Sequence, residues 1–128
     1  MIGETILYTA NTGMASIATA NSGLDGGGTL GTVLTAASNG TLIKNVTIKG
    51  QEAQTGGMVR LYIHDGSATR LFMEVEIPPA SGGSNSQYKT VSINLPINFS
   101  LKATWILKAS TEKAKAFNVI AEGLDWKY

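Results

Sequence analysis

The sequence predicts an all-β fold, an antiparallel β-sandwich of the jelly-roll type with six to eight strands. Three observations support this prediction. Apolar and polar residues alternate with a period of two over most of the segments that carry a readable pattern. Turn-forming residues, among them 15 glycines and 3 prolines, separate these segments at short intervals. Only 15% of the 128 residues are charged, and the abundant Thr, Ser and Asn suit a pleated strand surface better than an exposed helix face.

The clearest predicted element is a hairpin around Asp65-Gly66, a pair favoured in tight turns. Residues 59–64 and 70–77 alternate apolar and polar side chains on either side of this turn. The alternation predicts that Leu71 faces the core and that Phe72 lies on the polar face with Tyr62. Pro78-Pro79 ends the second strand, because proline cannot donate to a sheet ladder.

A second hairpin is predicted from residues 32–36 and 42–49, which flank the turn pair Asn39-Gly40. Further strands are expected at residues 90–95, 102–109 and 117–122. Residues 96–100 and 110–115 are expected to be linkers, and the second of these has the composition of a single helical turn at most.

The first 31 residues differ in texture from the rest of the chain. Residues 5–10 and 14–20 are candidate strands, and residues 21–28 form a glycine-rich loop that is expected to be flexible. Residues 1–31 are therefore either strands of the same sandwich or an arm that reaches onto a neighbouring subunit. We expect residues 32–128 to form the sandwich core, and the whole chain to be one domain.

Composition argues against several classes of function. Ten Lys and Arg against nine Asp and Glu give a net charge of +1, which disfavours nucleic-acid binding through bulk charge. The chain has no cysteine and a single histidine, His64, so no thiolate site and no two-histidine metal motif can form. No signal peptide or membrane-length apolar run is visible. We expect no metal, no cofactor, no small-molecule substrate and no membrane or nucleic-acid partner.

Three groups of polar residues could in principle carry chemistry. His64, Asp65 and Ser67 are the residue types of a hydrolase triad, but neighbours in a tight turn point apart. Glu74 and Glu76 share one strand face, where cross-strand pairing with Arg60 is a sufficient explanation. Asp25 precedes three glycines, as in part of a calcium loop, yet one carboxylate is too few ligands. We therefore expect no catalytic residue.

Aromatic residues are the stronger candidates for function. Core packing accounts for Trp105, Phe117 and Phe99, whereas the tail at residues 124–128 either packs back on the domain or anchors it to another chain. The candidate interface residues are Ile2, Ile6, Tyr8, Tyr62, Phe72, Trp126 and Tyr128.

Three segments resemble a known group of proteins: residues 57–66 (GMVRLYIHDG), 107–112 (LKASTE) and 117–123 (FNVIAEG). They are similar to segments of small virion proteins of tailed bacteriophages, of the capsid decoration or cement type. The resemblance spans about residues 32–125 and leaves the N-terminal segment and the aromatic tail outside. It implies a β-sandwich with a non-enzymatic structural role, a homotrimer placed at capsid symmetry positions, and the major capsid protein as partner.

The leading functional hypothesis is a capsid decoration protein on the surface of the virion, assembled in the bacterial cytoplasm, that stabilises the assembled head. The alternative is a receptor- or glycan-binding module of a tail or head fibre, in which Tyr62, Phe72 or Trp126 would stack on sugars. A hydrolase acting through His64 or through Glu74 and Glu76 is the third and weakest hypothesis.

Overall fold

The computed structural model describes residues 7–82 and 89–127. Over these residues the chain forms eight β-strands and no helix. A membrane-spanning helix is therefore not found in the described part of the chain. The strands are β1 (Tyr8–Ile17), β2 (Gly31–Thr35), β3 (Thr41–Gly50), β4 (Gly57–His64), β5 (Thr69–Ile77), β6 (Ser92–Leu101), β7 (Ile106–Thr111) and β8 (Phe117–Trp126).

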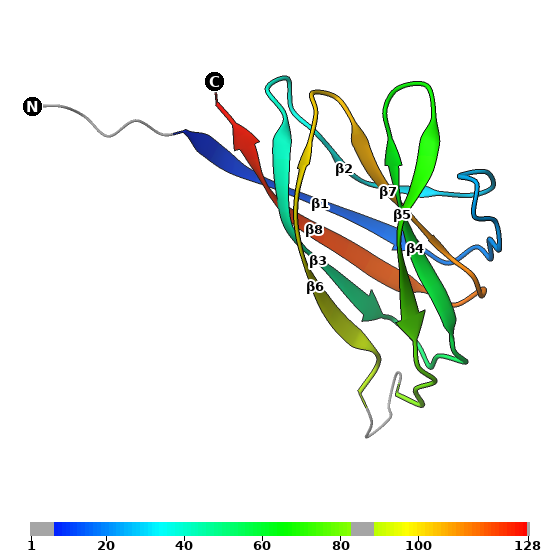
Figure 1. Ribbon diagram of the computed structural model, residues 1–128. Helices are drawn as coiled ribbons and strands as arrows, with labels where there is room; N and C mark the ends of the chain where they lie inside the picture. The colour runs from blue at the N-terminus through cyan, green and yellow to red at the C-terminus, as the bar shows by residue number, and fades with distance from the viewer. Residues whose placement is uncertain (1–6, 83–88, 128) are drawn as a thin grey trace, which may run out of the picture.

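The strands form two four-stranded sheets that pack face to face (Figure 1). The first sheet has the order β1-β8-β3-β6 and the second sheet has the order β2-β7-β4-β5. All pairings between these strands are antiparallel. The chain crosses between the sheets at nearly every connection, which is the winding of a jelly roll. The predicted fold class is confirmed.

The core lies between the two sheets and is built by the period-two alternation. Along β8, Phe117, Val119 and Ala121 are buried, while the residues between them are more exposed. Val59 and Leu61 of β4 are fully buried in the opposite sheet. Two such faces packed together remove one side chain in two from water, which is the main stabilising term in a sandwich.

The predicted hairpin around Asp65-Gly66 is confirmed. β4 and β5 pair with Val59 opposite Val75 and Arg60 opposite Glu74. Near the turn the register shifts, because Leu61 faces Met73 whereas Tyr62 faces Leu71. Phe72 is thus an extra residue, and this β-bulge reverses the alternation predicted for the turn-proximal end of β5.

The predicted hairpin around Asn39-Gly40 is wrong. Its two strands exist, but β2 belongs to the second sheet and β3 to the first. The turn still reverses the chain: the Gly40 amide donates to the Ala37 carbonyl and Gly40 has φ +89°. A turn pair in the sequence indicates that the chain reverses its direction, but it does not indicate which strand pairs with the next one. A connection between two sheets therefore has the same sequence pattern as a hairpin.

Several predicted boundaries are also corrected. Residues 96–100 belong to β6, and Pro96 is tolerated there because β6 is an edge strand of the first sheet. β7 begins only at Ile106, since the Trp105 amide donates to the Lys102 carbonyl and closes a turn. Residues 110–115 contain the end of β7 and a bend but no helical turn.

The N-terminal part of the described chain forms one long strand instead of two short ones. β1 pairs along its whole length with β8, from Tyr8 opposite Trp126 to Ile17 opposite Phe117. β2 crosses against the inner face of β1 at Gly13, where an added Cβ would lie 2.0 Å from the Val33 carbonyl oxygen. Only glycine permits this approach, which closes the sandwich at the β1–β2 corner.

Candidate interface at one end of the sandwich

The residues of a possible triad do not face one another. The His64 ring Nδ1 lies 2.8 Å from the Thr69 hydroxyl, across the hairpin. The Asp65 carboxylate instead accepts bonds from the amides of Ala68 and Ser67, at 2.8 and 3.0 Å. These two backbone donors lower the pKa of Asp65, because they favour its charged form. Asp65 therefore acts as a turn residue and does not orient the histidine.

One of the two acidic residues of β5, Glu74, pairs with Arg60, as the sequence predicts. The Glu74 carboxylate lies 3.4 Å from Nε of Arg60, whose side chain is 8% exposed. No cluster of three or more His, Asp or Glu side chains suitable for a metal occurs in residues 7–82 and 89–127. Asp25 accepts a bond from the Gly27 amide, which closes the glycine-rich loop on itself.

Tyr62 is not available to a partner, and its place among the interface residues is wrong. Its side chain is 0% exposed, and its hydroxyl donates to the Gly23 carbonyl at 2.7 Å. Arg60, on the same face of β4, donates to the Asn21 carbonyl. The polar face of β4 is thus covered by residues 18–30. They include the loop at residues 21–28, which was predicted to be flexible and instead packs over the second sheet.

Phe72 likewise points toward the core and not toward a partner. The bulge in β5 turns it into the sandwich, where its ring lies 4.8 Å from that of Phe99 in the first sheet. Leu71 takes the outward position and is 37% exposed. The predicted outward placement of Phe72 is therefore corrected.

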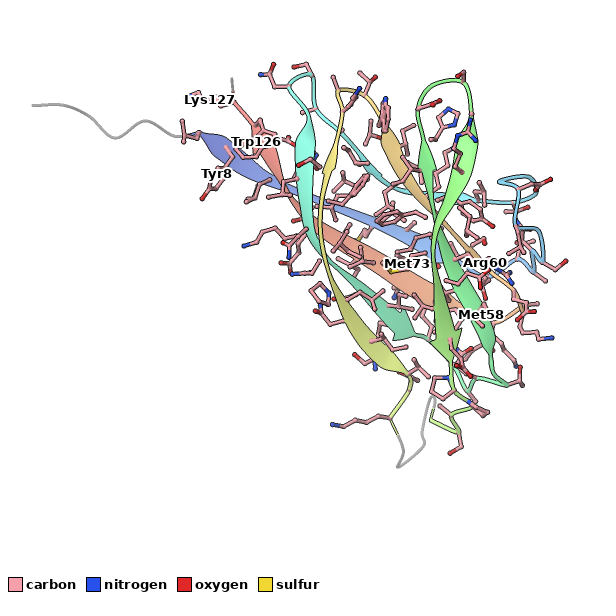
Figure 2. The ribbon with its side chains drawn as sticks, viewed as in Figure 1. Tyr8, Met58, Arg60, Met73, Trp126 and Lys127 are labelled. Carbon is pink, nitrogen blue, oxygen red and sulfur yellow. The ribbon has the colours of Figure 1, made fainter. Side chains whose placement is uncertain are left out.

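Tyr8 and Trp126 form an exposed aromatic pair at one end of the first sheet. Figure 2 shows both residues, with Lys127 beside them, at the end of β1 and β8. Their rings meet edge to face with centroids 6.2 Å apart, and they are 47% and 38% exposed. Leu7, which the sequence reasoning did not single out, adds a third exposed side chain at 54%. We call Leu7, Tyr8 and Trp126 the aromatic end.

Backbone bonds hold the aromatic end in place. The Lys127 amide donates to the Leu7 carbonyl, and the Trp126 amide donates to the Gly40 carbonyl. The Asn39 side chain donates to the Lys127 carbonyl at 2.8 Å. The tail is therefore part of the first sheet as far as Trp126, yet that ring remains exposed. Ile2, Ile6 and Tyr128, the other proposed interface residues, lie outside the described residues.

An open groove of about 610 Å³ lies beside Trp126. It is lined by the turn at residues 38–40, by residues 100–103 and Trp105 of a second turn, and by Trp126. The Lys102 ammonium lies 5.7 Å from the centre of the Trp105 ring, a cation–π distance. Thr104 in the second turn has φ +68°, a conformation that β-branched residues seldom adopt. Sequence reasoning missed this groove because it placed residues 102–105 in a strand.

No family model matches the chain, and no curated protein matches it. A chain of the capsid asymmetric unit of cyanophage Pam1 is similar in structure, with 14% identity over 98% of this chain and 91% of that chain, and a TM-score of 0.47. A pentameric capsid protein isolated from metagenomic phage sequences matches in two structures, with 19% identity over 89% of this chain. This chain covers 66% and 58% of those two chains, with a TM-score of 0.35 in each case.

These structural neighbours are phage capsid proteins.

Proposed function

We propose that this protein is a non-enzymatic decoration, or cement, protein that binds the assembled head of a tailed bacteriophage and stabilises its lattice. The aromatic end is the observation that carries the proposal. Leu7, Tyr8 and Trp126 together expose large apolar groups at one end of a rigid sheet. Two analogies add support. The jelly roll is a fold found in viral capsid and lectin domains, and three sequence segments resemble those of phage decoration proteins.

The geometry of the aromatic end suits a binding anchor. Trp and Tyr are enriched among the residues that dominate binding energy, because they bury a large area and lose few rotamers. Tyr8 and Trp126 already restrict one another through their edge-to-face contact. The backbone below them is fixed by the bonds at Lys127 and Trp126, so little ordering remains to oppose binding.

The proposed partners are the major capsid protein and further copies of this chain, assembled as a homotrimer at capsid symmetry positions. The protein would act on the outer surface of the virion. It would bind to the head while the virion is assembled in the bacterial cytoplasm. A net charge of +1 gives little repulsion between copies, and many moderate contacts repeated by symmetry give a high total affinity. No cofactor and no catalytic step form part of this role.

The proposal is tested by adding purified protein to undecorated heads of the parent phage and measuring co-sedimentation. We expect stoichiometric binding and a gain in the heat resistance of the heads. Trp126→Ala should weaken binding about 30-fold, the effect of losing roughly 2 kcal/mol at an interface anchor. Leu71→Ala removes an apolar side chain exposed to a similar degree on β5 and is the matched control.

Two results would contradict the proposal. One is that the wild-type protein does not bind heads at any ratio. The other is that Trp126→Ala and Leu71→Ala bind equally well, which would remove the aromatic end from the interface.

A second candidate function is glycan or receptor binding from a tail or head fibre. The groove lined by Trp105 and Trp126 favours it, because Ser38, Asn39 and Lys102 also line the groove and offer hydrogen-bonding groups. A glycan array probed with the purified protein tests this function. Binding that is lost in Trp126→Ala and kept in Tyr8→Ala, whose ring does not line the groove, would favour it over capsid decoration.

A further inference from the structure

The four sheet edges of this molecule are protected to very different degrees. β6 carries Pro96 and an irregular residue, Asn98, with φ +51°. β5 carries one basic and two acidic residues, and β2 has only five residues. Proline, charge, irregularity and shortness are the usual means by which proteins prevent edge-to-edge pairing. β1 has none of these, since its ten residues include no charge and no proline.

The hydrogen-bonding groups of β1 that face away from β8 can be assigned from the register. The Lys127 amide donates to the Leu7 carbonyl, so odd-numbered residues of β1 bond to β8. The even-numbered residues therefore direct both their amide and their carbonyl to the open edge. Their side chains all lie on the exposed face, and Met14 is 70% exposed. These residues are Tyr8, Ala10, Thr12, Met14 and Ser16.

The inner face of β1 is already covered by this chain. The Asn11 side chain donates to the Thr35 carbonyl of β2, and Gly13 packs against Val33. No described strand pairs with the open edge in the plane of the first sheet. Within residues 7–82 and 89–127, that edge is a strand-long row of backbone groups that no strand pairs, and an additional antiparallel strand would satisfy them.

We infer that this additional strand is β1 of a second copy of this chain, paired antiparallel about a twofold axis at Thr12. Only this centre lets all five outward residues bond at once. Tyr8 then lies opposite Ser16 of the second copy, and Ala10 lies opposite its Met14. Thr12 faces Thr12, a favourable cross-strand pair.

The pattern of β1 is what distinguishes a second copy from another partner. A twofold interface uses the same patch twice, so the patch must be complementary to itself. In this register each large side chain of the exposed face meets a small one. Because β1 has no charge, no like charges meet at the axis. A strand built to receive a different chain would need neither property.

This pairing goes beyond the proposed function and does not depend on it. It would join two isolated copies, and equally two copies that belong to neighbouring trimers. An edge contact of this kind buries little area and is expected to be weak. A covalent trap is therefore the suitable test, and a chain without cysteine makes the trap specific.

The experiment compares Thr12→Cys with Ser16→Cys in the full chain under mild oxidation. Residues paired across the axis have Cα atoms about 5.5 Å apart, which suits a disulfide. Two copies of residue 16 would lie about eight strand positions, or ~27 Å, apart. We expect Thr12→Cys to form a disulfide-linked dimer and Ser16→Cys to remain unlinked. Equal linking of the two variants, or no linking of Thr12→Cys, would overturn the inference.

A second measurement does not use cysteine. Thr12→Lys places two positive charges opposite each other at the axis, whereas Thr12→Ser keeps the position neutral. Thr12 is exposed, so both variants should fold. In sedimentation velocity over a concentration series, Thr12→Lys should weaken self-association at least tenfold and Thr12→Ser should not change it. Unchanged association of Thr12→Lys would also overturn the inference.

Discussion

The side chain of Asn21 is predicted to hold the 18–30 loop in its folded shape, and replacing Asn21 with alanine tests this role. Its side-chain amide donates to the carbonyls of Gly27 and Thr29, at 2.9 and 3.0 Å. The side-chain oxygen Oδ1 of Asn21 accepts a bond from the Gly23 amide at 3.0 Å. Asn21 is 9% exposed. Water therefore has little access to the backbone groups that would lose their partner in Asn21→Ala.

The expected cost follows from these three bonds. At about 1 kcal/mol net for each bond, Asn21→Ala should lower the free energy of unfolding by ~3 kcal/mol. Domains of this kind have only about 5–15 kcal/mol of stability, so the loss is large. Asn21→Asp should cost at least as much as Asn21→Ala, because a carboxylate would face the carbonyl oxygens of Gly27 and Thr29.

Urea unfolding followed by tryptophan fluorescence measures the effect. With a denaturant dependence of roughly 1.5 kcal/mol per M, the midpoint should fall by about 2 M. Asn39→Ala is the matched control, since exposed Asn39 makes one side-chain bond, to the Lys127 carbonyl. A change of less than about 0.5 kcal/mol in Asn21→Ala, no larger than in the control, would refute this account of the loop.

Three further predictions concern single groups. Tyr62→Phe removes the buried hydrogen bond to the Gly23 carbonyl and should lower the free energy of unfolding by about 1 kcal/mol in the same urea assay. An unchanged urea midpoint would contradict the role given to the Tyr62 hydroxyl. Thr104→Gly relieves a positive φ in an exposed turn and should raise the melting temperature by roughly 3 °C in calorimetry. A melting temperature below that of the wild type would show that the turn is not strained. The amides of Ala68 and Ser67 lower the pKa of Asp65 from 3.8, so its stabilisation is present above that pH and lost as the pH falls through the lowered pKa. Asp65→Asn should therefore lose less stability on acidification below pH 4 than the wild type does, and an identical pH profile would contradict this.

The strands themselves were readable from the sequence because their signal is local. In β8 the alternation of buried and more exposed residues follows directly from the alternation of apolar and polar types, whereas in β4 both faces are buried. Apart from the β4–β5 hairpin, the pairing of strands was not readable, since it depends on residues far apart in the chain. Asn39-Gly40 carries the same turn chemistry whether the next strand stays in one sheet or crosses to the other.

The candidate interface residues also divide into those that the local sequence indicates and those that depend on distant contacts. The sequence singles out Trp126 as a candidate interface residue, and the structure leaves its side chain exposed. The prediction for Tyr62 is wrong, because the loop that covers it comes from residues about forty positions earlier. The prediction for Phe72 is wrong for a different reason. One extra residue in a strand reverses the direction of every later side chain, and no residue type marks that position.

The place of β8 in the first sheet has a consequence for how the molecule is made. β8 is synthesised after the seven other strands, yet it lies between β1 and β3 and supplies the ladder that both of them use. A nascent chain that stops before Phe117 leaves these two strands without a common neighbour. Folding should therefore follow translation and not accompany it, at the slow rates of proteins rich in distant contacts. Prematurely terminated chains would expose apolar strands to chaperones and proteases and would not compete with complete copies.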